Sequence, residues 1–227
     1  MSFGEVLETS LDPMEETRFK KRHGKLIQRL SKRLHFTYRE LESVLLVYHK
    51  LQMESPEKNV GVTKGQFRDV LHAGFGMTDD TLMDRIFTAL EDRRGSARGG
   101  QIVGMEMWAT TLSLFLRGTL EEKIAHCFQV YDLMGEGMIG RDNMFQLMRT
   151  SIVGSGTDDD AEEAVRDMIE ILTKKMDRDR DGKISFDDYR GAVTSQPMLL
   201  ECLGKCLPSR LAVHAFLASF TPNVGKV

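Results

Sequence analysis

The sequence predicts an all-α protein made of two lobes, each a pair of helix–loop–helix units, with extra helices at both ends. Three observations lead to this fold class. Apolar residues recur at helical spacing along much of the chain. An acidic segment of twelve residues interrupts that pattern at 177–188, and a related segment lies 45 residues upstream at 132–143. Such units pair because one of them alone cannot bury its apolar face.

Composition indicates an ordinary protein of one or two domains. The chain has 227 residues, 41% hydrophobic and 29% charged, and a formal net charge of −3, which does not indicate a nucleic-acid binder. No apolar run approaches the ~20 residues of a membrane span, and the first residues form neither a signal peptide nor a myristoylation site. Three cysteines favour a reducing compartment, and Cys202 and Cys206 are interpreted as buried thiols rather than zinc ligands.

The segment DRDRDGKISFDD carries oxygen ligands at alternating positions of a twelve-residue loop. The predicted ligands are Asp177, Asp179, Asp181, Lys183 through its backbone carbonyl, Ser185 through a water molecule, and Asp188. Gly182 stands where the loop must turn sharply, and Ile184 is the aliphatic residue that pairs with a sister loop. The flanking apolar residues have helical spacing and are Met168, Ile169, Leu172, Met176, Phe186, Tyr189 and Val193. This is the EF-hand pattern, which surrounds a hard divalent cation with oxygen atoms.

The last loop position differs from the usual pattern, because Asp188 stands where a glutamate is common. An aspartate is one methylene shorter, so the loop must contract before both carboxylate oxygens reach a large Ca²⁺ ion. We therefore expect one Ca²⁺ site with weakened selectivity, at which Mg²⁺ competes at rest.

The sister loop at 132–143 retains the spacing but few of the ligands. Ile139 lies 45 residues before Ile184, which predicts a short antiparallel bridge between the two loops. Met134 and Asn143 occupy the third and twelfth positions, so Asp132 and Glu136 are the only acidic ligands that remain. We expect this loop to preserve the fold and to bind metal poorly.

The N-terminal pair has lost its metal sites more completely. Seventeen residues span 91–107, where a standard loop has twelve, because of the insertion RRGSARGG. A flexible insertion is favoured over a phosphate-binding loop, and Val103 and Trp108 mark the bridge and the following helix. In the first helix–loop–helix Pro56 interrupts the loop region, after a helix whose apolar face includes Leu41 and Leu45.

These assignments divide the chain into four segments. They are a basic amphipathic helix at 1–36, a degenerate EF-hand pair at 37–118, a second pair at 119–195, and C-terminal helices at 196–227. The first helix begins at Asp12 and Pro13. Its basic face is either solvated, with the helix capping a lobe, or in contact with an acidic filament or a membrane surface. We expect one helix before Pro208 and another after it, the latter in the groove of the C-terminal lobe.

Three blocks of sequence resemble the calaxin family, axonemal relatives of the neuronal calcium sensors. They are AGFGMTDDTLMDRIF at 73–87, LSLFLRGTLEEK at 112–123 and ILTKKMDRDRDGKISFDDYRGAV at 171–193. The resemblance implies a cytoplasmic protein of the ciliary or flagellar axoneme. It implies association with an outer dynein arm heavy chain and with docking-complex coiled-coil proteins, and contact with the doublet microtubule directly or through them. In this family the loops at 91–107, 132–143 and 177–188 usually carry ligands, and here only the last has a full set.

The function expected from the sequence is a calcium-binding axonemal component that regulates or braces dynein-driven motility. The alternative is a calcium-responsive regulatory subunit of an enzyme, of the phosphatase B-subunit type. A calcium buffer is disfavoured because three of the four loops are damaged. We expect no catalytic activity, since the sequence contains no P-loop, zinc-protease motif or nucleophile elbow.

Overall fold

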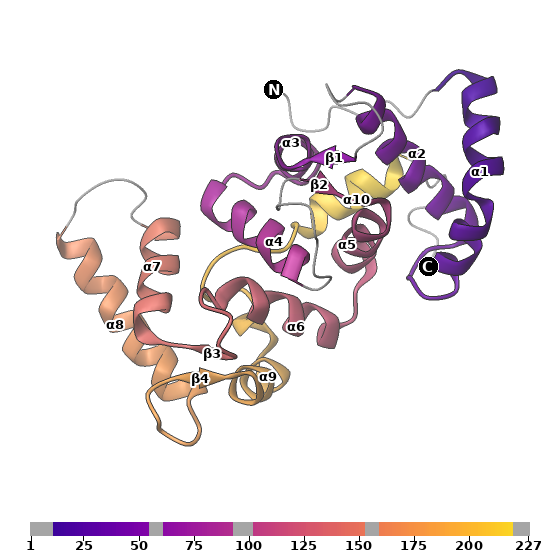
Figure 1. The fold of residues 1–227 in the computed structure, drawn as a ribbon. Helices are drawn as coiled ribbons and strands as arrows, with labels where there is room; N and C mark the ends of the chain where they lie inside the picture. Colours follow the sequence, from indigo (N-terminus) through magenta and orange to yellow (C-terminus); the bar gives the residue numbers. More distant parts are fainter. Residues whose placement is uncertain (1–10, 55–60, 93–101, 153–158, 220–227) are drawn as a thin grey trace. The chain divides into compact units, whose positions relative to one another are not determined.

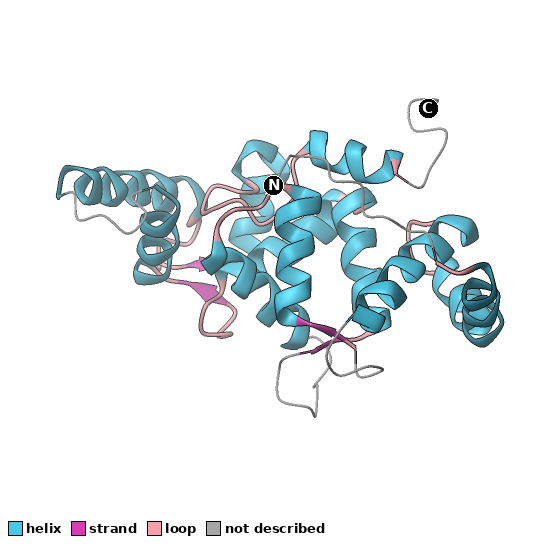
Figure 2. Cartoon of the chain, turned by 90° about the horizontal axis from the view of Figure 1, so that it is seen from above, coloured by secondary structure: helices cyan, strands magenta, loops and turns pink. Residues whose placement is uncertain are grey.

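The computed structural model describes residues 11–54, 61–92, 102–152 and 159–219, and Figure 1 traces their path. Helices make up most of this part, and the strands form two short pairs (Figure 2). The predicted all-α class is confirmed. The chain divides into two compact units. None of the helices in the described ranges is both long and apolar enough to cross a membrane.

The first unit comprises residues 1–78, 94–118 and 208–227. Its elements are α1 (Pro13–Ser31), α2 (Tyr38–Glu54), β1 (Val62–Thr63), α3 (Lys64–Phe75), β2 (Ile102–Val103), α5 (Met105–Arg117) and α10 (Arg210–Ala218). The second unit comprises residues 79–93 and 119–207. Its elements are α4 (Asp80–Asp92), α6 (Leu120–Tyr131), β3 (Met138–Ile139), α7 (Arg141–Ile152), α8 (Asp159–Met176), β4 (Ile184–Ser185), α9 (Phe186–Ser195) and the short 3₁₀ helix η1 (Pro197–Leu199).

Local sequence sets where several helices begin. Asp12 is the N-cap of α1, and its side chain accepts a hydrogen bond from the Met14 amide while Pro13 occupies the first turn, as predicted. Thr63, Thr119 and Ser185 each form a reciprocal capping box with the residue three positions later. These caps satisfy amide groups that have no partner within the helix.

Each unit contains one antiparallel strand pair that joins two loops. Val62 pairs with Val103 in the first unit, and Ile139 pairs with Ile184 in the second. The bridging role predicted for Val103 and for the two isoleucines is therefore confirmed. All four side chains are fully buried, so each bridge also fixes an apolar contact between its two loops.

The core of the first unit is built around Trp108, which is completely buried. Its Nε1 donates a hydrogen bond of 3.0 Å to the backbone oxygen of Val44 in α2, and its ring meets Phe67 of α3 edge-on. The Tyr48 hydroxyl donates a 3.0 Å hydrogen bond to the backbone oxygen of Val103. Trp108 of α5 thus contacts both α2 and α3 and joins the three helices.

An ion pair between Glu40 and Arg117 joins α2 to the end of α5. The Arg117 guanidinium donates to both Glu40 carboxylate oxygens at 2.9 and 2.5 Å, and also to the His35 backbone oxygen. The Glu40 carboxylate further accepts hydrogen bonds from the amide and hydroxyl of Thr37. Burial raises the pKa of Glu40, but the hydrogen bonds from Arg117 and Thr37 outweigh it, so the net pKa is lowered.

Replacing Arg117 by alanine is expected to lower the free energy of unfolding by about 1–3 kcal/mol at pH 7. The loss is less than for a fully buried pair, because the Arg117 side chain is one-third exposed. The lowered folded-state pKa of Glu40 means that the pair stabilises the fold above the unfolded-state pKa, and that this stabilisation is lost as the pH falls through the folded-state pKa. Urea denaturation at pH 7 and at a pH well below 4.5, the ordinary pKa of a glutamate, measures both effects.

Arg39→Ala is the control for this measurement, because Arg39 is an exposed arginine in the same helix. It is expected to change the unfolding free energy by less than about 0.5 kcal/mol. If Arg117→Ala changed the unfolding free energy as little as Arg39→Ala does, or if its effect did not decrease in acid, the ion pair between Glu40 and Arg117 would not stabilise the fold.

The chain after α9 differs from the predicted helix before Pro208. Only η1 is helical there, and the remainder folds as turns against α6. The Tyr131 hydroxyl donates a 2.6 Å hydrogen bond to the Gly204 backbone oxygen, and the Cys206 and Cys127 sulfur atoms are 3.1 Å apart. Cys206 is fully buried as expected, whereas Cys202 is only half-buried. Gly204, with φ of 140°, provides a backbone conformation that does not continue a helix.

The closing helix also lies in a different place from the one expected. We expected it in the groove of the C-terminal lobe, but α10 packs on α3 and α5 of the first unit. The Phe216 ring stacks on Phe75, with centroids 4.8 Å apart, and Leu217 is also buried. The expectation was wrong because the apolar face of α10 packs against Phe75 in the first unit, a choice of partner that the local pattern of the helix does not reveal.

The units do not coincide with the segments expected from the sequence. The range 37–118 was expected to form one lobe, yet α4 is grouped with the second unit, where it packs against α6. Its apolar residues Leu82, Met83, Ile86 and Phe87 are all buried. A broadly apolar helix can join either of two cores, and local periodicity alone does not reveal which one.

Candidate metal site

The loop at 177–188 connects α8 to β4 and α9 and turns twice through left-handed backbone conformations. Arg180 has φ of 62° and Gly182 has φ of 84°. In the 132–143 loop Gly135 and Gly137, at the corresponding positions, have φ of 69° and 76°. The two loops therefore share one backbone turn, although Arg180 adopts a conformation that costs a non-glycine residue roughly 1 kcal/mol.

Three carboxylates meet inside the 177–188 loop. Oxygen atoms of Asp177, Asp179 and Asp181 all lie within 4.8 Å of one another. In the described part of the chain this is the one group of acidic, histidine or cysteine side chains close enough to share an ion. Three hard oxygen donors at this separation suit Ca²⁺ or Mg²⁺ and not a thiolate-seeking metal.

Backbone amides hold these carboxylates in place. Asp177 accepts hydrogen bonds from the amides of Arg180 at 2.7 Å and Gly182 at 2.9 Å. Asp179 accepts from the Asp181 amide at 3.3 Å, and Asp181 accepts from the Lys183 amide at 2.7 Å. The chain therefore wraps around its own acidic side chains and points them toward the loop interior.

The electrostatics of the cluster favour a positive ion. The hydrogen bond from the Asp181 amide lowers the pKa of Asp179. Desolvation, the charge of Asp181, a hydrogen bond with the Asp177 side chain and the charge of Asp188 outweigh it, so the net pKa is raised. Part of this rise comes from the neighbouring negative charges, which disfavour the charged form of Asp179. A divalent cation would relieve that repulsion.

The predicted ligands at the end of the loop take a different arrangement. Asp188 is buried and lies outside the group of three, and its carboxylate accepts bonds from the Ser185 hydroxyl at 2.6 Å and the Arg178 amide at 3.3 Å. Burial raises the pKa of Asp188, but these hydrogen bonds and the charge of Arg178 outweigh it, so the net pKa is lowered. Ser185 and Asp188 thus cap α9 in this structure, and Lys183 is exposed.

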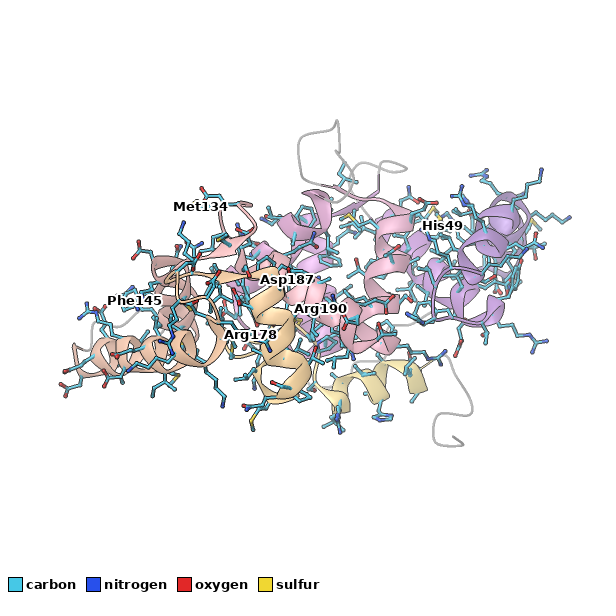
Figure 3. The ribbon with its side chains drawn as sticks, turned by 90° about the horizontal axis from the view of Figure 1, so that it is seen from below. His49, Met134, Phe145, Arg178, Asp187 and Arg190 are labelled. Carbon is cyan, nitrogen blue, oxygen red and sulfur yellow. The ribbon has the colours of Figure 1, made fainter. Side chains whose placement is uncertain are left out.

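The Arg178 side chain lies against α9. A Cβ atom at Gly191 would stand 2.6 Å from the Arg178 guanidinium carbon, so the glycine makes room for that side chain. Figure 3 labels Arg178 near Asp187 and Arg190 on this helix. Its positive charge acts on Asp188 and offsets part of the acidity at the closing end of the loop.

The 132–143 loop has the same turn without the acidic cluster. Asp132 accepts hydrogen bonds from the Glu136 and Gly137 amides at 3.1 and 2.7 Å. Met134, at the third loop position, is 70% exposed and is labelled in Figure 3. The insertion in the 91–107 loop and the residues around Pro56 lie outside the described residues.

Sequence reasoning missed one contact at the sister loop. Arg85 of α4 donates hydrogen bonds to the backbone oxygens of Asp132 at 3.0 Å and Val130 at 3.5 Å, at the C-terminal end of α6. A cation there complements the helix dipole and orients the first residue of the loop. No local pattern could reveal it, because the residues are more than 40 positions apart. Met168 also differs from the expectation, since it is exposed on α8 whereas Ile169, Leu172 and Met176 are buried.

Comparison with known protein sequences shows what the chain is similar to. A family profile described as an EF-hand domain pair matches residues 121–194. Calaxin of Xenopus laevis is 41% identical over 184 residues, which cover 80% of this chain and 86% of that protein. Calaxin of Danio rerio is 40% identical over 200 residues, covering 85% of this chain and 92% of that protein. The chain belongs to the calaxin family.

The calaxin match and the EF-hand pair make this chain a calcium-binding EF-hand protein. A more distant relative, the calcineurin B-subunit of Schizosaccharomyces pombe, is 26% identical over 119 residues, covering 52% of this chain and 63% of that protein. The calaxin similarity therefore spans much more of the chain. A metal ion would be held by the carboxylates of Asp177, Asp179 and Asp181, with the Lys183 carbonyl, Ser185 and Asp188 as the remaining predicted ligands.

Proposed function

We propose that the chain is a calcium-binding component of the ciliary or flagellar axoneme that regulates or braces dynein-driven motility. The proposed partners are an outer dynein arm heavy chain and the coiled-coil proteins of its docking complex, with the doublet microtubule contacted directly or through them. The observation that carries the proposal is similarity to calaxins over at least 80% of the chain, which includes both units.

We propose that the chain binds one divalent ion, in the 177–188 loop. Three carboxylates converge in that loop, whereas the sister loop places exposed Met134 at one of the ligand positions. A protein with one site responds to calcium without the steep cooperativity of coupled sites. The ion would act as a modulator or brace of a scaffold whose partner contacts persist without it.

The outward face of α8 offers a surface suited to a partner helix. Met168 and Ile171 are 43% and 64% exposed and lie three residues apart, on adjacent turns of one face. Coiled-coil helices present apolar side chains at similar spacing. We assign this face to a docking-complex helix, in the manner of helix recognition by other EF-hand proteins.

Ile171→Glu is expected to reduce recovery of the chain with detergent-extracted axonemes by roughly tenfold, because it places a charge in an apolar contact. The measurement is quantitative immunoblotting of axonemes from ciliated cells that express tagged variants, with proximity labelling to identify neighbours. Leu211→Glu is the matched control, since Leu211 is a similarly exposed aliphatic residue on α10.

The alternative is a regulatory subunit of the phosphatase B-subunit type, for which the partial match to the calcineurin B-subunit is the supporting observation. Labelling of a dynein heavy chain and docking proteins in the axoneme would support the axonemal proposal. Recovery in the soluble fraction together with a phosphatase catalytic subunit would contradict it.

A further inference from the structure

A continuous stripe of positive charge runs along the exposed side of α1. At 3.6 residues per turn, five exposed basic side chains of α1 fall within one-third of the helix circumference, and two more follow directly after its last residue, Ser31. They are all exposed and are Arg18, Lys21, Arg22, Lys25, Arg29, Lys32 and Arg33, hereafter the basic stripe. The helical part of the stripe, from Arg18 to Arg29, is about 17 Å long at 1.5 Å per residue. Figure 3 shows nitrogen-tipped side chains projecting from the pale indigo ribbon of α1.

Most of this charge is not neutralised within the described residues. Arg29 pairs with Glu106, and Arg18 contacts the Met14 sulfur atom. The other five side chains form no hydrogen bond or ion pair with the described part of the chain. No aspartate or glutamate occurs between Thr17 and Arg39. Like charges so close together destabilise the isolated helix, which indicates that a negative partner compensates them.

The opposite side of α1 is already in use. Phe19, Ile27 and Leu30 are at most 3% exposed, and the helix packs against α2 through this face. A helix that lies in a membrane surface inserts its apolar face among the lipids. Because α2 covers that face, α1 cannot insert it into a membrane, and only the charge of the basic stripe could attract anionic lipids. A partner other than a membrane is therefore favoured.

The negative charge of the rest of the chain disfavours a broad anionic partner that would approach surfaces outside the basic stripe. Without the basic stripe, 24 Lys and Arg remain against 34 Asp and Glu, a net charge of −10. A nucleic-acid duplex is a broad rod with one charge per about 1.7 Å, so this acidic remainder would repel it. Two aromatic residues are interleaved with the stripe, but Phe19 is buried and the His23 ring packs against it with centroids 4.6 Å apart, so neither presents a fully exposed ring to a single-stranded base. An acidic polypeptide can lie along one helix without approaching other surfaces.

We propose that the basic stripe of α1 binds an acidic polypeptide segment rich in glutamate or aspartate. Binding rests on charge complementarity between Lys and Arg side chains and a row of carboxylates. It is independent of the metal loop, which lies in the other unit. The interaction is expected to weaken as salt rises, because the Debye length falls to about 10 Å at 0.1 M ionic strength.

A fluorescein-labelled peptide of ten glutamates tests this proposal with the full-length chain. Fluorescence anisotropy would measure its affinity at low and moderate salt. The variant Lys21→Glu/Lys25→Glu/Lys32→Glu reverses three charges of the stripe and is expected to lose at least roughly tenfold in affinity. The variant Lys21→Gln/Lys25→Gln/Lys32→Gln removes the same three charges without reversing them, and we expect it to lose less affinity. It replaces the charge-reversed variant in the test if circular dichroism shows that the latter does not fold.

The control Lys175→Glu/Lys205→Glu/Arg210→Glu makes the same change in net charge at exposed residues outside α1. It is expected to keep the peptide affinity within about threefold of the original chain, because long-range charge effects are screened by salt. No peptide binding at low salt, or an equal loss in the control, would overturn the proposal. Tighter, stripe-dependent binding of phosphatidylserine vesicles or of a short DNA duplex would also overturn it, by assigning the stripe to another polyanion.

Discussion

Replacing Asp177 and Asp188 together by alanine is expected to abolish divalent-ion binding, lowering the affinity for Ca²⁺ by roughly a hundredfold or more. Asp177 supplies one of the three converging carboxylates. Its two oxygens also accept hydrogen bonds from the amides of Arg180 and Gly182, and these bonds shape the turn. Asp188 is the predicted closing ligand. Isothermal titration calorimetry would show one binding event in the original chain and none in the variant.

Asp187→Ala provides the matched control, because Asp187 is an exposed acid at the eleventh loop position, where no ligand is predicted. It removes one charge from the same segment and is expected to change the affinity by less than about threefold. Asp132→Ala in the sister loop is likewise expected to leave the binding event intact. Two or more tight Ca²⁺ events, or an unchanged titration in the double variant, would contradict the assignment.

Trp108→Ala is expected to have the largest effect on stability, lowering the free energy of unfolding of the first unit by about 3–5 kcal/mol. The indole is fully buried among α2, α3 and α5, and its Nε1 hydrogen bond to Val44 is lost as well. The cavity left behind cannot close without movement of Phe67 and Tyr48, whose rings flank it. Chemical denaturation followed by circular dichroism measures the change.

Tyr38→Ala serves as the comparison, since this aromatic residue of α2 is 42% exposed. Its expected cost is below about 1 kcal/mol, because little buried surface is lost. If Trp108→Ala cost no more than Tyr38→Ala, the first unit would not be organised around the tryptophan.

Much of the fold was predictable because it follows from local chemistry. The cap at Asp12 and Pro13 and the apolar face that includes Leu41 and Leu45 depend on short-range spacing. The bridge between Ile139 and Ile184 was predictable for another reason, because both residues hold the same position in two related loops. The grouping of α4 and the position of α10 were not predictable in this way. Both depend on which of two apolar surfaces a helix covers, and that choice is made by distant parts of the chain.

The candidate site shows the same division. The spacing of Asp177, Asp179 and Asp181 predicted three carboxylates around one point, and the structure brings them together. The capping of α9 by Ser185 and Asp188 was not predicted, because the same residues satisfy both the ligand pattern and the capping-box pattern. The contact from Arg85 to the sister loop joins residues distant in sequence and has no local signature.

A crystal of the chain grown with calcium tests the central claim most directly, through the anomalous scattering of bound Ca²⁺. We expect one anomalous peak per chain, enclosed by the carboxylates of Asp177, Asp179 and Asp181. A second peak in the 132–143 loop or the 91–107 loop, or no peak beside Asp179, would contradict a protein with a single metal site.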